Sequence, residues 1–141
     1  AGDYTKDLGM EWSLSEHELA STRAEMVVAS RLGELEPPVD TVFIHIKEDE
    51  AFRVSCELVR DLGFQGKLCI HPGQISTANT AFTPTEEQLA FAKKVINAFV
   101  EAEAAGSASI QIDGYFVDYP IVDKAQRIVD IAEAIARAEA A

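Results

Sequence analysis

The sequence predicts an α/β fold with a parallel sheet, because candidate helices and strands alternate along the chain. Two short runs, residues 41–46 and 67–70, have the β-branched and apolar character of strands. They lie about 25 residues apart, which is typical of one strand–helix–strand unit with a right-handed crossover. Near the end of the chain, Asp113-Gly114 between apolar residues predicts a hairpin.

The first predicted helix spans residues 13–32 and precedes the first strand. Ser13 and Glu16 have the spacing of a capping box, which satisfies backbone N–H groups at a helix start. Gly33 follows at the position where a left-handed residue commonly ends a helix. The segment therefore has both a start and a stop signal, and Pro37-Pro38 prevents its continuation.

The first predicted strand, residues 41–46, is β-branched, aromatic and apolar, as in a strand covered on both faces. Residues 48–62 form the next predicted helix, with inward positions at Phe52, Cys56, Val59 and Leu62. The second strand, residues 67–70, ends abruptly in His71-Pro72-Gly73-Gln74. We expect this polar turn to be functional, since α/β enzymes carry their chemistry at the carboxyl ends of strands.

Three further elements complete the chain. Thr83, Pro84 and Glu86 predict a helix start with threonine at the N-cap. This helix is expected to run to about Ala105, before Gly106. Beyond it, the sequence predicts the hairpin over residues 110–117 and a final helix over 121–138.

The composition indicates a globular protein with a real core and without a nucleic-acid surface. Of the 141 residues, 48% are apolar and 26% are charged, and the formal net charge is −12. Such a surface repels a polyphosphate backbone, so we expect no nucleic acid partner. No apolar run approaches a membrane span, and Ala1–Tyr4 has no signal-peptide character, so we expect no membrane partner. Cys56 and Cys69 lack CxxC spacing and are expected to be reduced, buried residues of a cytoplasmic protein.

Two parallel strands cannot form a sheet that is covered on both faces, so these elements are expected to belong to a larger structure. Ala1-Gly2-Asp3 also has the character of a strand end whose body is absent. A (β/α)₈ TIM barrel needs about 250 residues. We therefore expect residues 1–106 to be C-terminal βα units of such a barrel and residues 107–141 to be a C-terminal extension of hairpin and helix.

Three segments carry a family resemblance that covers the whole chain. They are Gly2-Asp3-Tyr4-Thr5-Lys6-Asp7-Leu8-Gly9, the block from Gly63 to Gln74 with Asn79, Phe82 and Pro84, and Asp113-Gly114-(x)₃-Asp118-x-Pro120 with Ala125. On these segments the chain resembles the C-terminal portion of the citrate lyase β-subunit-like family. This family is the CoA-ester branch of the HpcH/HpaI aldolase superfamily and includes citryl-CoA, malyl-CoA and citramalyl-CoA lyases.

The resemblance implies a magnesium site that includes Asp3. In the family a Glu from strand five and an Asp from the strand-six loop hold Mg²⁺, and Asp3 matches that Asp. Magnesium binds one or two carboxylates together with waters and substrate oxygens, which suits a carboxylate at a strand end. The alternative is that Asp3 is an ordinary frayed terminal residue, with Asp7 as a helix-start or supporting carboxylate.

The resemblance also implies that Asp118 is the catalytic acid or base. It matches an Asp on a C-terminal segment that reaches a neighbouring subunit's active site, in a homotrimer or a multiple of one. The carboxylate would move one proton at the methyl carbon of the acyl thioester. The alternative is structural, because Asp118-Tyr119-Pro120 also makes an ordinary bend before a helix.

Four residues border the CoA ester if the resemblance holds: Lys67, His71, Pro72 and Gln74. Lys67 would contact phosphate, although a lysine at such a place is usually solvated. His71 could be a general base, but a histidine before proline is as often part of a shape-setting turn. Gln74 would either bind the ligand or close its own loop. His45, in the first strand, is expected to be a satisfied barrel-lining histidine rather than a ligand.

These expectations describe a magnesium-dependent carbon–carbon lyase that cleaves or forms a β-hydroxyacyl-CoA thioester. Two alternatives stay open: an aldolase for a free hydroxy-oxo acid without CoA, and a non-catalytic subunit or fragment. Dinucleotide, P-loop, zinc-protease and nucleophile-elbow motifs are absent from the sequence. Because the resemblance places the metal Glu and a substrate arginine outside this chain, we do not expect the chain alone to catalyse.

Overall fold

In the computed structural model, which describes residues 1–140, the chain forms two compact units. The first is Ala1–Phe82, and the second begins at Thr83. This boundary lies before the predicted one at 106/107, because helix α5 (Glu86–Ala104) shares a core with the hairpin and the final helix. The division into barrel units and an extension stays a prediction.

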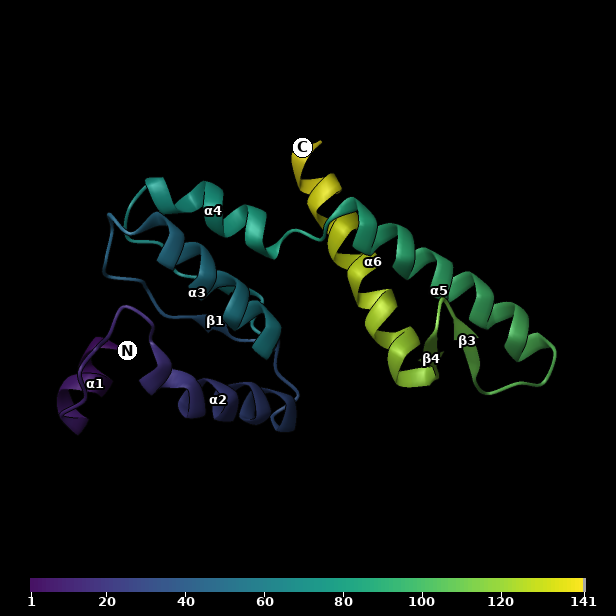
Figure 1. Cartoon of the computed structure of the whole chain (residues 1–141), viewed down its shortest axis with the longest axis horizontal. Helices are drawn as coiled ribbons and strands as arrows, with labels where there is room; N and C mark the ends of the chain where they lie inside the picture. Colours follow the sequence, from purple (N-terminus) through teal and green to yellow (C-terminus); the bar gives the residue numbers. More distant parts are fainter. Residues whose placement is uncertain (141) are drawn as a thin grey trace. The chain divides into compact units, whose positions relative to one another are not determined.

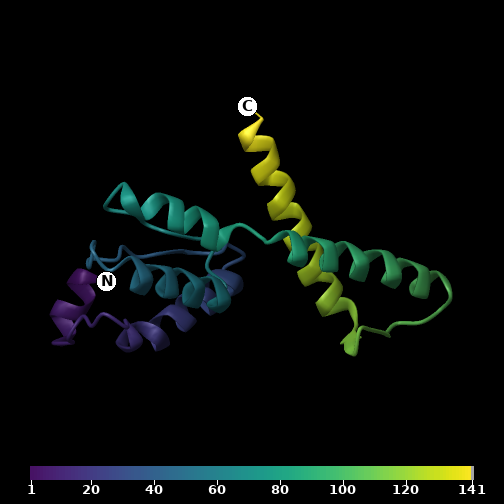
Figure 2. The ribbon, with the colours of Figure 1, turned by 45° about the horizontal axis from the view of Figure 1, so that its top comes forward.

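The first unit alternates helices with short strands. Its elements in chain order are α1 (Gly2–Leu8), the 3₁₀ helix η1 (His17–Leu19), α2 (Ala20–Leu32), β1 (Val39–Asp40), α3 (Asp49–Leu62), β2 (Gly66–Lys67) and α4 (Gly73–Phe82). The strands are parallel, with Val39 opposite Gly66 and Asp40 opposite Lys67. In Figure 1 and Figure 2, α3 lies between α2 and α4. This arrangement confirms the predicted α/β class.

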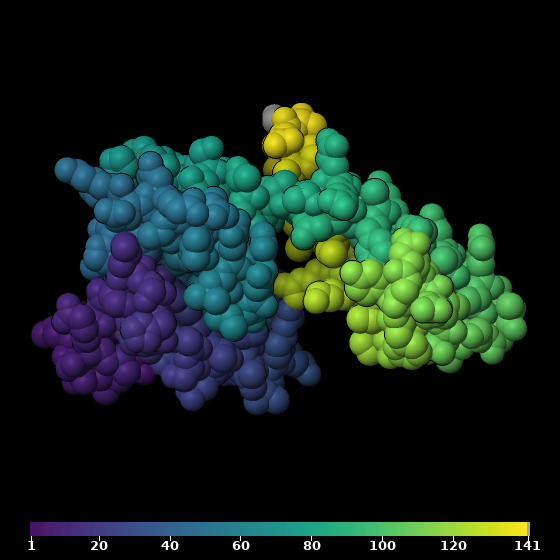
Figure 3. Space-filling view, in the orientation of Figure 1, coloured from purple at the N-terminus to yellow at the C-terminus, as the bar shows by residue number. Residues whose placement is uncertain are grey.

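The core of the first unit lies between α3 and α4. Phe52 and Cys56 on α3 pack with Ala78 and Ala81 on α4 and with Phe43, which is completely buried after β1. The Phe43 and Phe52 ring centroids are 5.6 Å apart. Burial of a large apolar side chain contributes about 1.5–3 kcal/mol. In the space-filling view of Figure 3 the residues from α1 to α4, coloured purple to teal, form one continuous body.

The second unit is a helix pair with a hairpin. Its elements are α5, β3 (Ile110–Ile112), β4 (Tyr115–Val117) and α6 (Tyr119–Glu139), and their shared core is Ala92, Val95, Phe99, Ile112, Val117, Ala125 and Val129. Asp113 and Gly114 have φ of 50° and 86°, the two positive values of a type I′ turn. The predicted hairpin and final helix are confirmed. None of the helices in residues 1–140 has the length and apolar character that crossing a membrane requires.

The strands are shorter than the sequence predicts, and the first lies before its predicted position. β1 is Val39–Asp40, so no residue of the predicted strand 41–46 belongs to it, and β2 shares only Lys67 with the predicted strand 67–70. The ladder ends where Leu68 N–H donates to the Asp40 carbonyl at 3.0 Å. Ile44 and Ile46 are 41% and 44% exposed, so the predicted cover on both faces is wrong for the described residues. A parallel strand keeps its ladder only beside a neighbour, and within residues 1–140 β1 and β2 have only each other.

Two helices differ from the sequence prediction. Gly2–Leu8 forms α1 where the sequence predicts a strand end, and Gly73–Phe82 forms α4 where it predicts only a turn and a loop. α4 is composed largely of small and polar residues, so its apolar periodicity is weak. Its buried alanines pack against α3, and this tertiary contact stabilises a helix that its own sequence signals poorly.

The predicted capping box at Ser13 and Glu16 is wrong. Glu16 has φ of 52° and its side chain is turned into the interior, where the residue is 1% exposed. Ser13 instead bonds Glu18: its backbone N–H donates to Oε1 at 2.8 Å and its hydroxyl donates to Oε2 at 2.7 Å. Glu16 instead accepts hydrogen bonds from the buried Arg23 and Ser55, and these interactions stabilise it more than a local capping bond would.

Two other helix ends are also displaced. Thr85, not Thr83, caps α5, and its hydroxyl accepts a hydrogen bond from Gln88 N at 3.1 Å. Gly33 has φ of −82°, and the left-handed residue after α2 is Glu34, with φ of 54°. In both cases the sequence offers two nearby candidates, so the pattern predicts the helix end to within two residues.

Candidate functional site

The predicted ligand loop connects β2 to α4. His71 and Pro72 are exposed, whereas Gln74 is only 4% exposed. Gln74 Oε1 accepts a hydrogen bond from Ile70 N at 3.0 Å, and its Nε2 donates to the Phe43 carbonyl at 2.9 Å. Both ends of its amide are therefore engaged in closing the loop, which is one of the two roles predicted for it.

The position of Lys67 argues against the predicted phosphate contact. Its side chain is 0% exposed, and its Nζ lies 2.5 Å from Asp40 Oδ2 and 3.6 Å from Glu16 Oε2. Reaching a phosphate would require the ammonium to leave these buried carboxylates, and breaking a buried ion pair is strongly unfavourable. We therefore assign Lys67 to the interior of the first unit and not to the CoA contacts.

Lys67 belongs to a buried charge cluster that could not be predicted from the sequence. Arg23 on α2 donates to Asp40 from Nε at 2.9 Å and from Nη2 at 2.8 Å, and Nη2 also donates to Glu16 at 2.8 Å. Ser55 on α3 donates to the same Glu16 oxygen. Two cations and two carboxylates leave the cluster formally neutral. Because the residues are far apart in sequence, no local spacing could predict that they meet.

The charge of Arg23 is fixed by this environment. Burial acts to lower its pKa, but hydrogen bonds to Asp40 and Glu16 and their negative charges outweigh this effect, so the pKa is raised. A guanidinium that stays charged neither gives nor takes a proton. We therefore regard the buried charge cluster as structural rather than catalytic.

Asp118 stands between β4 and α6, at the N-cap position, and is half-buried. Its backbone carbonyl accepts hydrogen bonds from Ile121 N and Val122 N, both at 3.0 Å. Its carboxylate makes no capping hydrogen bond, although aspartate commonly caps a helix in this way. The bend before a helix, which the sequence offers as the alternative to a catalytic role for Asp118, is therefore present. The carboxylate of Asp118, however, does not cap the helix.

The neighbouring Tyr119 has a defined partner. Its hydroxyl donates to Glu103 Oε1 at 2.8 Å, and this hydrogen bond, together with the charge of Glu103, raises the pKa of Tyr119. The phenol is thus held as a protonated donor toward α5. Within this turn, the carboxylate of Asp118 is the better candidate for proton transfer.

Asp3 lies exposed in the first turn of α1, and Asp7 lies near the end of the same helix rather than at a helix start. Residues 1–140 contain no group of three or more His, Cys, Asp or Glu side chains that could hold a metal ion. An exposed carboxylate fits magnesium as one ligand of a set completed by other groups. The metal role of Asp3 therefore stays a prediction that needs a further ligand.

Two predictions about interior residues are wrong. His45 is half-buried, and its Nε2 has no hydrogen-bond partner among the residues described, so it is not a satisfied histidine. Its ring lies edge-on to Phe43, with centroids 5.6 Å apart. Cys56 is buried as predicted, but Cys69 is exposed because it follows the end of β2. Residue type alone does not reveal where a ladder stops.

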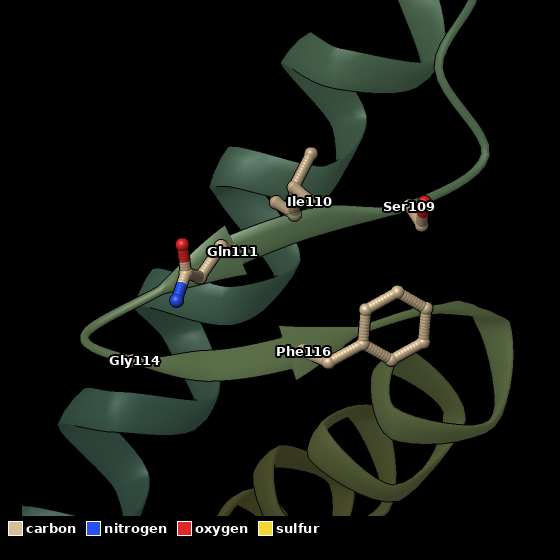
Figure 4. A pocket seen from close by; sticks show the side chains of 5 residues that line it. All are labelled: Ser109, Ile110, Gln111, Gly114 and Phe116. Atoms are coloured by element: carbon tan, nitrogen blue, oxygen red, sulfur yellow. The ribbon is translucent and has the colours of Figure 1, made fainter.

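A shallow depression on the hairpin is lined by Ser109, Ile110, Gln111, Gly114 and Phe116. Figure 4 shows the side chains of Ile110 on β3 and Phe116 on β4 beside it. Since none of the lining residues is titratable, the depression offers no acid, base or carboxylate ligand. It is therefore not our candidate site.

The structure brings together only part of the predicted site. His71 and Pro72 lie in the connection from β2 to α4, Gln74 lies in the first turn of α4, and Asp3 belongs to the same compact unit. Asp118 belongs to the second unit. The chain thus carries three separate candidate groups: the ligand loop, the carboxylate on α1 and the carboxylate before α6.

Comparison with known proteins gives a consistent family. The family model described as HpcH/HpaI aldolase/citrate lyase matches residues 1–72, about half of the chain. Citrate lyase subunit beta of Haemophilus influenzae is 34% identical over 139 residues, which is 99% of this chain and 47% of that protein. A (3S)-malyl-CoA thioesterase of Cereibacter sphaeroides is 34% identical, covering 95% of this chain and 47% of that protein. The mitochondrial citramalyl-CoA lyase of Rattus norvegicus is 29% identical, covering 94% of this chain and 39% of that protein.

Solved structures agree on the fold. A crystal structure of protein CitE from Mycobacterium tuberculosis, in complex with magnesium, acetoacetate and coenzyme A, has a TM-score of 0.74 at 23% identity. The match covers 92% of this chain and 48% of that one. The chain spans about half the length of the relatives that it matches. On the family model that matches its first 72 residues, the chain belongs to the HpcH/HpaI aldolase/citrate lyase family.

Proposed function

We propose that the complete polypeptide carrying this chain is a magnesium-dependent carbon–carbon lyase that acts on a β-hydroxyacyl-CoA thioester. The observation that carries the proposal is that a citrate lyase subunit and a citramalyl-CoA lyase match 94–99% of this chain. These matches extend over the ligand loop and the turn with Asp118. Because the chain spans about half of such relatives, the proposal concerns the whole protein rather than the chain alone.

Asp118 is the residue that we propose moves the proton. In the cleavage direction the bond between the α and β carbons breaks, the β-hydroxyl gives its proton to water, and that fragment leaves as an oxo acid. The acyl-CoA fragment leaves as an enolate and takes one proton at carbon to become an acetyl-type thioester. A carboxylic acid at position 118 would give that proton, and its carboxylate would remove it in the reverse direction. Water later returns one proton to Asp118, so that cleavage neither consumes nor releases a proton overall. The absence of a capping hydrogen bond leaves the carboxylate available for this role.

Asp3 would contribute one carboxylate to the magnesium ion. Its exposure and its place at the start of α1 fit a single ligand in a shared coordination shell. When bound, the ion supplies Lewis-acid polarisation of the oxygens at the hydroxy-acid end. The magnesium in the CitE complex from M. tuberculosis supports this proposal for the family.

We further propose that residues 1–106 are C-terminal units of a TIM barrel, and that residues 107–141 extend from it. Within residues 1–140, β1 is paired along one edge only, and a groove beside it is lined in part by the exposed side chains of Tyr4, Met26, Val39 and Leu68. Exposed apolar surface next to an open strand edge favours further pairing. A homotrimer, in which Asp118 serves a neighbouring subunit, follows from the resemblance and belongs to the same proposal.

A second candidate is hydrolysis of the thioester. The C. sphaeroides relative, named as a malyl-CoA thioesterase, is as similar to this chain as the citrate lyase subunit of H. influenzae. In that reaction water adds to the thioester carbonyl, the carbon–sulfur bond breaks, and free CoA thiol leaves. The products separate the two candidates, because a lyase releases an acyl-CoA and an oxo acid without free thiol.

The test uses the complete polypeptide with magnesium and malyl-CoA or citramalyl-CoA. We expect an oxo acid and acetyl-CoA as products, and a fall in kcat of about 10²–10⁴-fold in Asp118→Asn. Asp123→Asn, an exposed carboxylate on α6, is the matched control and should keep full activity. Cleavage of free hydroxy-oxo acids but not thioesters would favour the CoA-independent alternative. No turnover of either substrate class would favour a non-catalytic role.

A further inference from the structure

The ladder between β1 and β2 stops at an identifiable rung. Leu68 N–H donates to the Asp40 carbonyl at 3.0 Å, and no backbone rung follows it in residues 1–140. In a continued parallel ladder, the next N–H on this side, that of Ile70, would donate to the Val42 carbonyl. Ile70 N instead donates to Gln74 Oε1 at 3.0 Å. A side chain from α4 has therefore taken the place of the neighbouring strand.

The same side chain also holds the other segment. Gln74 Nε2 donates to the carbonyl of Phe43 at 2.9 Å, across 31 residues of sequence. Continuing the register of β1 and β2 by three residues places Phe43 opposite Ile70. The carboxamide thus joins the two segments at the level where their backbones no longer bond each other. Because Gln74 is 4% exposed, losing either hydrogen bond would leave a buried polar group unpaired.

The first residues of α4 are also hydrogen-bonded to the exposed His71. Gln74 N–H donates to the His71 carbonyl at 3.0 Å, and Gly73 N–H donates to His71 Nδ1 at 3.1 Å. An imidazole that accepts at Nδ1 is neutral and carries its proton on Nε2. A Cβ on Gly73 would lie 3.1 Å from that Nδ1, so the glycine allows the close approach. His71 therefore presents an Nε2–H donor outside the loop.

We propose that Gln74 is a positioning residue, which holds the ends of the two strand segments so that His71 donates from Nε2 to an oxygen of the CoA ester. The proposal rests on the proposed function for its ligand and on the two amide hydrogen bonds for its geometry. A carbonyl or phosphate oxygen accepts such a donor. Gln74 itself does not touch the ligand and acts only through the loop.

Two variants of the complete polypeptide test this role. Gln74→Met keeps the side-chain length and removes both hydrogen bonds. Gln74→Glu keeps the shape, and its protonated form can still donate to Phe43 and accept from Ile70, whereas its carboxylate cannot donate. Burial favours the protonated acid, so lowering the pH from about 9 to about 6 should restore the interaction. Because His45 and His71 lie nearby, each variant is compared with wild type at the same pH.

The readouts are KM for the CoA ester and the ¹⁵N signals of the His71 ring. We expect KM to rise about tenfold or more in Gln74→Met, with kcat within about twofold of wild type. Gln74→Glu should show the same rise near pH 9 and approach wild type near pH 6. Gln65→Glu, an exposed glutamine in the same unit, is the control and should behave as wild type.

The ¹⁵N signals of the His71 ring test the positioning role of Gln74 without any need for turnover. In unliganded wild type we expect the Nε2-protonated tautomer for His71, assigned by the loss of its signals in His71→Asn. Gln74→Met should abolish the single tautomer. An unchanged His71 signal in Gln74→Met would overturn the proposal. So would a Gln74→Glu variant in which kcat falls by the same factor as KM rises and in which neither quantity recovers near pH 6. If the protein turned over no CoA ester, the proposed function would fail, but the tautomer measurement would still test whether Gln74 positions His71.

Discussion

Arg23 and Asp40 meet through two parallel hydrogen bonds, Nε to Oδ1 at 2.9 Å and Nη2 to Oδ2 at 2.8 Å, across 17 residues of sequence. Both side chains are nearly inaccessible, with 3% and 4% exposure. This bidentate pair joins α2 to β1, and Lys67 on β2 shares the same carboxylate. The stability of the first unit should therefore depend on the buried charge cluster as well as on its apolar core.

Arg23→Met should destabilise the protein, because it leaves Asp40 and Glu16 buried with fewer cationic partners. Breaking a buried pair by removing one member costs about 3–5 kcal/mol. Urea unfolding of the complete polypeptide, followed by circular dichroism, measures the change. Arg53→Met is the control, since Arg53 pairs with Glu50 and Glu57 on the surface of α3. An unchanged midpoint for Arg23→Met would contradict the structural role of the cluster.

Lys67→Met separates stability from ligand binding. Because Asp40 keeps its bidentate bond to Arg23, we expect a smaller loss than for Arg23→Met, about 1–3 kcal/mol of unfolding free energy. The KM for a CoA ester should stay within about twofold of wild type. Lys47→Met, at an exposed lysine of the same unit, should change neither quantity. A raised KM without a loss of stability would instead support the phosphate contact that the sequence predicts for Lys67.

The sequence predicts best those elements whose signals are local. The helix ending at Gly63 is confirmed because a glycine with φ of 107° stops it in place. The hairpin is confirmed because Asp113-Gly114 selects one turn type. Neither the position nor the length of β1 is predicted, because it is Val39–Asp40 rather than residues 41–46, and a strand extends only as far as its neighbour accompanies it. Glu16 is misassigned for the same reason, since its partners Arg23 and Ser55 belong to other elements.

The candidate site divides in the same way. His71, Pro72 and Gln74 can be found from the sequence because they are adjacent and follow an apolar run. Which of them faces solvent cannot be found, since it depends on the distant carbonyl of Phe43. Lys67 has the residue type of a phosphate ligand, but its partners are set by pairing with Asp40 across the strands. Residue type predicts the chemistry of a side chain, and topology decides whether that chemistry is accessible.

The two cysteines should differ strongly in reactivity. Burial, the main cause, raises the pKa of Cys56 to about 11, whereas Cys69 is exposed. Under native conditions near pH 8, iodoacetamide should modify Cys69 many times faster than Cys56. Mass spectrometry of peptides after timed alkylation measures both rates. Cys69→Ser should remove the fast phase, and equal rates for the two thiols in the folded protein would contradict the burial of Cys56.

The same shift predicts the alkaline stability of the fold. The pKa of the Cys56 thiol is higher in the folded protein, about 11, than its ordinary value of 9.0. Between these values the folded state binds more protons than the unfolded state, so stability falls as the pH rises. The contribution is fully present below pH 9.0 and is lost as the pH rises through about 11. Cys56→Ala should weaken this decline in urea midpoints, and an unchanged pH dependence would contradict the shift.

Gly114→Ala should destabilise the second unit through the backbone alone. Gly114 has φ of +86°, and a Cβ there would meet no atom within 4 Å, so crowding is not the cause. A non-glycine residue in the left-handed region costs about 1–2 kcal/mol. Gly114→Asn should lose less, because asparagine tolerates this region. Gly66→Ala is the control, since its Cβ would lie at an ordinary 3.8 Å from Val39.

The turn at Gly114 also bears on the proposed chemistry. Its strand β4 leads directly into Asp118, and Lys94 holds Asp113 from α5 at 2.6 Å and 2.8 Å. If Asp118 moves the proton, Gly114→Ala should lower kcat more than it raises KM, because the turn positions the carboxylate and not the CoA loop. Steady-state kinetics of the complete polypeptide, measured where the variant is fully folded, test this split. If the variant is destabilised but keeps the kcat of wild type, the turn stabilises the hairpin without positioning Asp118 for catalysis, and this prediction is wrong.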